Sequence, residues 1–105
     1  MYKVEFEEGV YDYLTAYFTS FCRYYESLYE DSGLWNEDMI IDGYVREANL
    51  RKDDIIFSLE KYLSQDIILG RRTDSESIYR WRTKYIFITW IQEGNMRIVK
   101  HIEIR

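Results

Sequence analysis

The residues best suited to chemistry are basic and lie in the last third of the chain, around its one histidine. They are Arg80, Arg82, Lys84, Arg97, Lys100, His101 and Arg105. Cleavage of a phosphodiester needs cations that hold the phosphate and stabilise developing negative charge, together with a general base or acid. Arginine and lysine suit the first task, and histidine or tyrosine suits the second. These residue types indicate a groove that cleaves RNA. The plainer interpretation is a row of solvated polar residues on a sheet face.

Alternation along the predicted strands separates these cations into sets. Arg80 and Arg82 are expected on one face of their strand, and Arg97, His101 and Arg105 on one face of the last strand. If the protein is a nuclease, Arg82, Arg97 and His101 should converge in one groove.

Aromatic residues of this region have two alternative uses. Trp81, Tyr85 and Trp90 could stack on bases, but Trp90 alternates with Ile86 and Ile88 and is therefore expected in the core.

Signatures of other reaction classes are missing from the sequence. It has one histidine and one cysteine, and no HExxH, Walker or GxSxG motif, so neither a metal site nor a cofactor is predicted. Because Cys22 is the one cysteine of the chain, no intrachain disulfide can form, and this indicates a reducing compartment. The start, Met1 to Gly9, alternates and does not resemble a signal peptide, and the apolar stretches are far shorter than the roughly 20 residues of a membrane span. We expect a cytoplasmic protein.

Charge divides the chain into two parts. Residues 1–60 hold 5 Lys or Arg and 14 Asp or Glu, a balance of −9, whereas residues 61–105 hold 9 and 5, a balance of +4, which together give the net charge of −5. Binding to a nucleic acid would therefore have to be local to the second part. The length of 105 residues and the absence of proline predict a single domain over residues 1–105.

The elements that position these residues follow from periodicity. Tyr2 to Phe6 alternates as a strand with one buried face, and apolar residues recur every three or four positions from Val10 to Leu28, as on one helix. Asp31 to Gly33 supplies the stop. Asn36 is a candidate cap for a second helix, and a helical pattern from Leu50 to Leu63 either continues that helix or forms a third.

Three strands end the chain. They are predicted at Ile78–Arg82, Tyr85–Gln92 and Met96–Arg105, with Thr83-Lys84 as the first turn and Gly94-Asn95 as the second. The class is therefore α+β: an N-terminal strand, two or three helices, and a three-strand antiparallel meander with the helices packed on one face of the sheet.

The first helix carries six of the eleven tyrosines, more aromatic surface than one buried stripe can hide. Tyrosine is enriched where proteins meet partners, so we predict a partner-binding surface on this helix. Its candidate residues are Tyr13, Tyr17, Tyr24 and Tyr25. The alternative is that these rings pack beneath the neighbouring helix.

The opening YKVEF, the tyrosine-rich helix and the tail IYRWRTKYIFITWIQEGNMRIVKHIEIR resemble the RelE/ParE superfamily of type II toxins. The resemblance implies a helical hairpin on an antiparallel sheet and neutralisation by a partner antitoxin. It also implies either mRNA cleavage at the ribosome or poisoning of DNA gyrase without nuclease activity. By position, Arg82 resembles the family arginine that ends the second strand and Tyr85 the tyrosine that opens the third. Arg97, Lys100 and His101 fall where nuclease members place basic residues or histidine.

This sequence departs from the family pattern in two ways that bear on activity. Ile86 stands where many members have an arginine, and the pI near 4.9 is unusual for a protein that approaches the polyanionic ribosome. The candidate catalytic set is Arg80, Arg82, Tyr85, Arg97, Lys100 and His101. Two functions therefore stay open: a toxin-like protein that cleaves mRNA, or a non-catalytic interaction module with the same fold. Either would bind an antitoxin-like protein or a second copy of itself.

Overall fold

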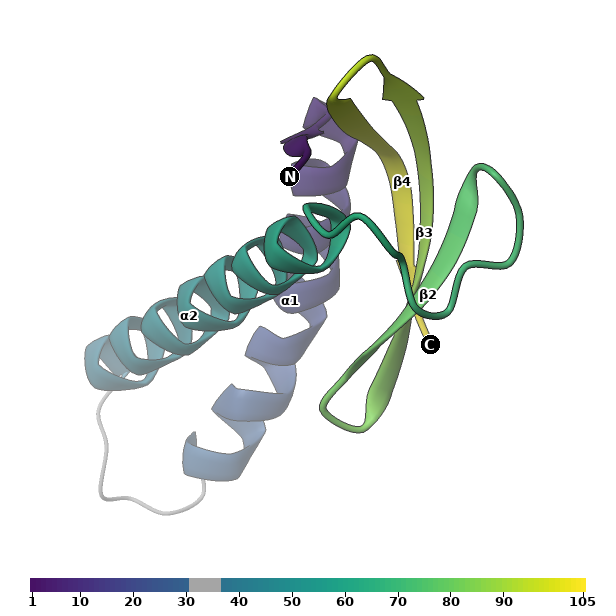
Figure 1. The fold of residues 1–105 in the computed structure, drawn as a ribbon. Helices are drawn as coiled ribbons and strands as arrows, with labels where there is room; N and C mark the ends of the chain where they lie inside the picture. Colours follow the sequence, from purple (N-terminus) through teal and green to yellow (C-terminus); the bar gives the residue numbers. More distant parts are fainter. Residues whose placement is uncertain (31–36) are drawn as a thin grey trace. The chain divides into compact units, whose positions relative to one another are not determined.

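A computed structural model gives one strand, two helices and three strands, which confirms the predicted α+β class (Figure 1). It describes the backbone of residues 1–30 and 37–105, and the side chains of residues 1–20, 43 and 45–105. The elements are β1 (Lys3–Phe6), α1 (Glu8–Glu30), α2 (Glu37–Leu63), β2 (Glu76–Trp81), β3 (Lys84–Glu93) and β4 (Met96–Ile104).

The region after residue 36 forms one continuous helix rather than two. α2 runs for 27 residues and includes Gly43, whose cost of about 1 kcal/mol in a helix does not interrupt it. The predicted cap Asn36 and the predicted stop at residues 31–33 lie outside the described residues.

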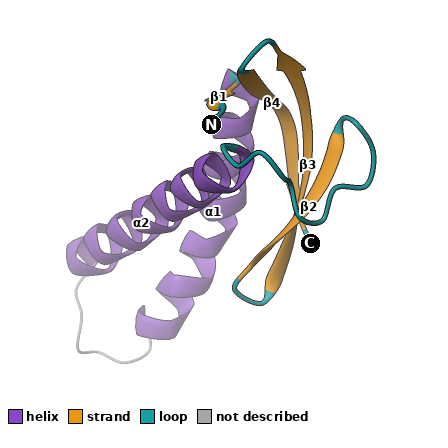
Figure 2. Cartoon of the chain, viewed as in Figure 1, coloured by secondary structure: helices purple, strands orange, loops and turns teal. Residues whose placement is uncertain are grey.

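The strands form one mixed sheet in the order β1-β4-β3-β2 (Figure 2). β2, β3 and β4 make the predicted antiparallel meander, and β1 joins at the edge by parallel pairing with β4. The parallel pair requires a long crossover, which the two helices supply.

Two-residue turns connect the meander. The Gly94-Asn95 turn is confirmed, with positive φ only at Gly94 (61°), as a type II′ turn requires. The first turn is Arg82-Thr83 rather than Thr83-Lys84, because Trp81 pairs with Lys84. Arg82 has a φ of 56°, which costs a non-glycine residue about 1 kcal/mol or more.

A bulge in β4 changes which of its side chains face the core. Thr89 pairs with His101, but the next residue of β3, Trp90, pairs with Val99. Lys100 is therefore an extra residue on β4. Because of it, the buried residues of β4 lie on one face on both sides of the bulge: Arg97, Val99, Ile102 and Ile104. The predicted strict alternation therefore fails across the bulge, and Arg97 lies on the opposite face from His101 and Arg105.

The chain forms two compact units, and both helices contribute to each. The sheet unit contains Met1–Tyr13 and Ile55–Arg105, and the helical unit contains Leu14–Asp54. In the sheet unit, buried apolar residues of the sheet and of the helix ends form the core: Val10, Ile55, Leu59, Leu63, Ile86, Ile88, Trp90, Val99, Ile102 and Ile104. In the helical unit, Leu14, Phe18 and Ala48 are buried, and Arg51 pairs with Glu47 one helical turn away. Neither α1 nor α2, over its described residues, is long and apolar enough to cross a membrane.

Candidate functional site

The meander has a core face and an open face, and the open face carries the candidate site. On β3 the residues Ile86, Ile88 and Trp90 point into the core, so those between them point the other way. Cross-strand register then defines three rows on the open face, each read from β2 to β4: Arg80, Tyr85 and Arg105; Ile78, Phe87 and Glu103; Glu76, Thr89 and His101.

The first row lies at the end of the sheet where cations gather. Tyr85 and Arg105 exchange backbone hydrogen bonds of 2.9 and 2.8 Å, and Arg80 is the partner of Tyr85 on the other side. Arg82 of the adjoining turn and Lys84, the first residue of β3, lie at the same end of the sheet, and both are exposed. We call these four cations, Arg80, Arg82, Lys84 and Arg105, the basic end. Tyr85 lies among them with 49% of its surface exposed.

Side-chain contacts hold part of the basic end in place. Arg105 donates from Nε and Nη2 to the two carboxylate oxygens of Glu103 at 3.0 and 3.1 Å, and its guanidinium lies 4.2 Å from the centre of the Phe87 ring. Hydrogen bonding by Arg105 lowers the pKa of Glu103, and Glu103 in turn raises the pKa of Arg105. The Nε of Arg80 donates to the Arg82 carbonyl at 3.3 Å. Arg80, Arg105 and the exposed ring of Tyr85 therefore share one surface.

A hollow of about 210 Å³ lies over the second and third rows of the open face. Its ionisable lining residues are Arg72, Glu76, His101, Glu103 and Arg105. The hollow therefore combines cations with an imidazole, a side chain that can act as a general acid or base. His101 lies two rows from the basic end, a backbone distance of roughly 14 Å at about 3.4 Å per residue.

Arg97 does not lie in this groove, so the predicted convergence of Arg82, Arg97 and His101 is wrong. Arg97 is on the core face and only 2% exposed. Its Nη1 donates to the carbonyls of Leu63, at 2.7 Å, and Gln65, at 2.5 Å, and its guanidinium lies 3.7 Å from the centre of the Tyr2 ring. These contacts assign it a structural position that ties the end of α2 to β4.

Two other predicted residues lie elsewhere than expected. Lys100 occupies the bulge and forms an ion pair with Glu7. Arg82 does not share a strand face with Arg80, because β2 ends at Trp81 and Arg82 belongs to the turn. Of the six predicted catalytic residues, the structure places Arg80, Tyr85 and His101 together on the open face.

Trp81 and Trp90 have structural positions. Trp90 is fully buried, as predicted, and its Nε1 donates to the Ser77 hydroxyl at 3.0 Å. Trp81 is 8% exposed and therefore cannot stack on a base as it stands. Burial raises the pKa of Tyr62, whose hydroxyl donates to the Leu69 carbonyl. Tyr85 is thus the candidate stacking residue whose ring is accessible.

The structure describes the side chains of two predicted partner-binding tyrosines, Tyr13 and Tyr17. The Tyr13 hydroxyl accepts the backbone N–H of Ile104 at 2.8 Å, and its ring lies edge-on to His101 at 6.1 Å. Tyr17 is half-buried in the helical unit. The side chains of Tyr24 and Tyr25 lie outside the described residues. Partner binding by this helix stays a prediction.

Arg72 is a residue of the hollow that the sequence interpretation missed. Its segment reads as a polar loop, and nothing in its composition places it over a strand. Two backbone bonds fold it back there: the amide of Arg72 donates to Glu76 at 2.8 Å, and Arg71 forms an isolated bridge with Ser77.

Comparison of the chain with protein-family models, curated proteins and solved structures found no match. Within the described side chains, no three His, Cys, Asp or Glu residues come together as ligands for a metal ion.

Proposed function

We propose that this is a toxin-like protein that binds single-stranded RNA on the open face of its sheet. The observation that carries the proposal is the basic end, where Arg80 and Arg105 flank an exposed Tyr85. Arginines neutralise RNA phosphates, and an aromatic face stacks on any base. The net charge of −5 opposes binding in general, so the affinity has to come from this local cluster.

The element order also supports a toxin-like protein. A strand, a helical hairpin and an antiparallel meander form the arrangement that the RelE/ParE resemblance implies. An antitoxin-like partner is part of the same proposal.

Cleavage of the bound RNA would fall to the hollow beside the basic end. There His101 is the group suited to proton transfer, and Arg72 and Arg105 are the cations suited to stabilising negative charge.

A second candidate, a non-catalytic interaction module, is favoured by a different observation. Arg97 is buried in the fold and Lys100 is paired with Glu7, so two cations of the predicted catalytic set are occupied. The two functions differ in whether the protein cuts RNA.

Removing Arg80 and Arg105 together should weaken binding of a fluorescent single-stranded RNA at least about tenfold, measured by anisotropy. Because about two phosphate contacts are lost, the slope of log K against log salt should become shallower by about 1.4. The matched control is Arg46→Ala with Lys61→Ala, which removes the same charge from exposed positions on α2. An equal loss in the control, or no RNA binding by the unmodified protein, would contradict the proposal.

His101→Gln separates binding from cleavage. If the protein cuts RNA, this variant should lose about 10²-fold or more of the cleavage rate, because a general acid or base contributes that much, and its RNA affinity should stay unchanged. The measurement is single-turnover cleavage of an end-labelled RNA, with and without ribosomes, beside the growth of cells that express each variant. Tight binding without cleavage in any of these assays would select the non-catalytic function.

A further inference from the structure

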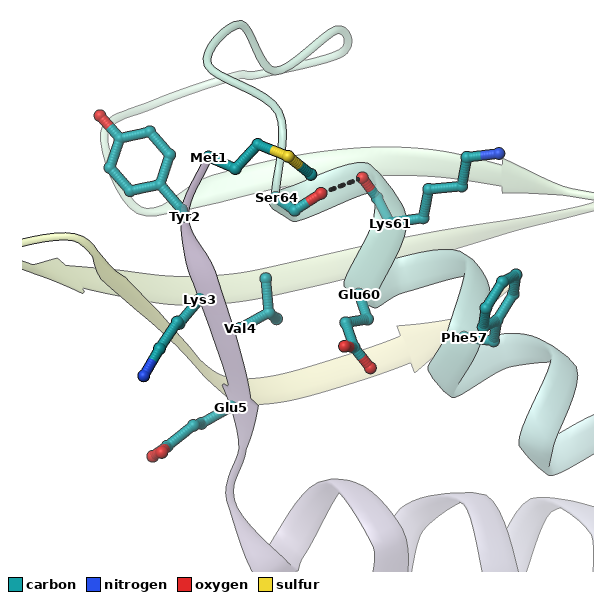
Figure 3. Close-up of a pocket in the computed structure, with 9 residues that line it drawn as sticks. All are labelled: Met1, Tyr2, Lys3, Val4, Glu5, Phe57, Glu60, Lys61 and Ser64. Atoms are coloured by element: carbon teal, nitrogen blue, oxygen red, sulfur yellow. Dashed lines mark hydrogen bonds between the residues drawn. The ribbon is translucent and has the colours of Figure 1, made fainter.

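β1 lies at the edge of the sheet, and a hollow of about 490 Å³ runs along it (Figure 3). Lys3 and Glu5 point to one side of the strand and Val4 to the other, toward α2, yet all three line the hollow. A hollow lined from both faces of a strand follows the edge of that strand. Its far wall comes from the C-terminal end of α2, including Phe57.

The backbone of β1 has polar groups directed to this edge. Lys3 donates to the Asn95 carbonyl at 2.9 Å and Glu7 to the Val99 carbonyl at 3.0 Å, so odd-numbered residues bond toward β4. Even-numbered residues therefore direct their amides away from β4. The amide of Tyr2 is used at one end, where it donates to Ser64 at 3.0 Å. The backbone amide and carbonyl of Val4, at the middle of the edge, therefore face outward, where a further strand can pair with them.

We propose that two copies of this chain pair through β1 in antiparallel fashion, with the two-fold axis at Val4. Each Val4 amide then donates to the Val4 carbonyl of the other copy, as in a hydrogen-bonded antiparallel pair. The same register places Lys3 of each copy opposite Glu5 of the other. The interface is isologous and carries two cross-strand ion pairs.

The charges of Lys3 and Glu5 favour the register with the axis at Val4 over the register with the axis one residue later. An axis at Glu5 would place the two Glu5 side chains directly opposite each other, which is unfavourable. The sequence Lys3-Val4-Glu5 is therefore complementary to itself only when Val4 lies on the axis.

Exposed apolar surface beside the edge of β1 also fits a second copy of the chain. Phe57 is 68% exposed on the wall of the hollow, and Met1 is 90% exposed at its end. In the paired arrangement the two α2 ends lie on the same side of the joined sheet, so each Phe57 covers the Val4 pair. This interface uses no residue of the basic end, and its test is independent of RNA binding.

Charge reversal provides the test, with sedimentation velocity over a concentration series as the measurement. The unmodified chain should shift from monomer to dimer as its concentration rises. Lys3→Glu and Glu5→Lys should each weaken dimerisation at least about tenfold, because both ion pairs become repulsive. The double variant should recover it, and an equimolar mixture of the two single variants should form a heterodimer.

Val4→Pro tests the backbone pairing. Proline lacks an N–H but is tolerated at a sheet edge where that N–H faces solvent, so this variant should fold and stay monomeric. Arg46→Glu is the charge control, and thermal unfolding verifies that each variant is folded. A chain that stays monomeric at every concentration, a dimer that is indifferent to the reversals, or a mixture that fails to associate would each overturn the proposal. A monomer that instead binds an extended peptide along this edge would identify a different partner.

Discussion

Arg97→Ala should destabilise the protein by about 3–5 kcal/mol, the largest effect expected for an arginine of the sheet unit. The guanidinium donates from Nη1 to the Leu63 and Gln65 carbonyls, and each hydrogen bond from a charged group is worth about 1.5–3 kcal/mol. Its removal leaves the buried Leu63 carbonyl without this donor and opens a cavity beside Tyr2 and Trp90. Urea denaturation followed by circular dichroism measures the change.

Arg80→Ala is the matched control, because Arg80 is exposed and its loss should change the free energy of unfolding by no more than about 0.5 kcal/mol. Arg97→Lys should lower the free energy of unfolding by an intermediate amount, since an ammonium group keeps the charge but not the planar contact with Tyr2. If Arg97→Ala unfolds like the unmodified protein and yet abolishes RNA cleavage, the structural assignment is wrong and the sequence-based catalytic assignment is right.

The misassignment of Arg97 has a single physical origin, the bulge at Lys100. A one-residue shift in a strand moves every following side chain to the other face. Residues before the bulge, such as Arg97, therefore share the core face with Ile102, although simple alternation puts them on opposite faces. No residue type marks the bulge in the sequence, so periodicity could not reveal it.

The hairpins and the strand order of the meander were predictable because they depend on local signals. Gly94 supplies a positive φ, and the runs beside it are β-branched and aromatic. Arg82 supplies a positive φ too, but arginine does not signal it, so the first turn was placed one residue too late. The open-face position of Arg80 and Tyr85 followed from the strands, whereas Arg72 depends on a loop whose path only tertiary bonds define.

Gly70→Ala should destabilise the sheet unit by about 2–4 kcal/mol. Gly70 has a φ of +81°, and left-handed backbone alone costs an L-residue about 1–2 kcal/mol. A Cβ built there would lie 2.4 Å from the Ile78 carbonyl oxygen, which is backbone and cannot rotate away. The same two residues are joined by a hydrogen bond of 2.9 Å from the Ile78 amide to the Gly70 carbonyl, so separating them also weakens the start of β2.

Gly9→Ala makes the same chemical change where nothing opposes it. Gly9 lies in the first turn of α1, and among the described residues no atom outside its chain neighbours and its own helical backbone lies within 4 Å of the added methyl. This variant should therefore be as stable as the unmodified protein or more stable by up to about 1 kcal/mol. Comparing the two midpoints of thermal unfolding isolates the effect of the site from that of the residue type. Equal midpoints would mean that the chain around Gly70 can shift without cost. The unequal result expected here would show that the backbone at Gly70 does not tolerate a Cβ, two residues before Arg72, which lines the hollow that contains His101.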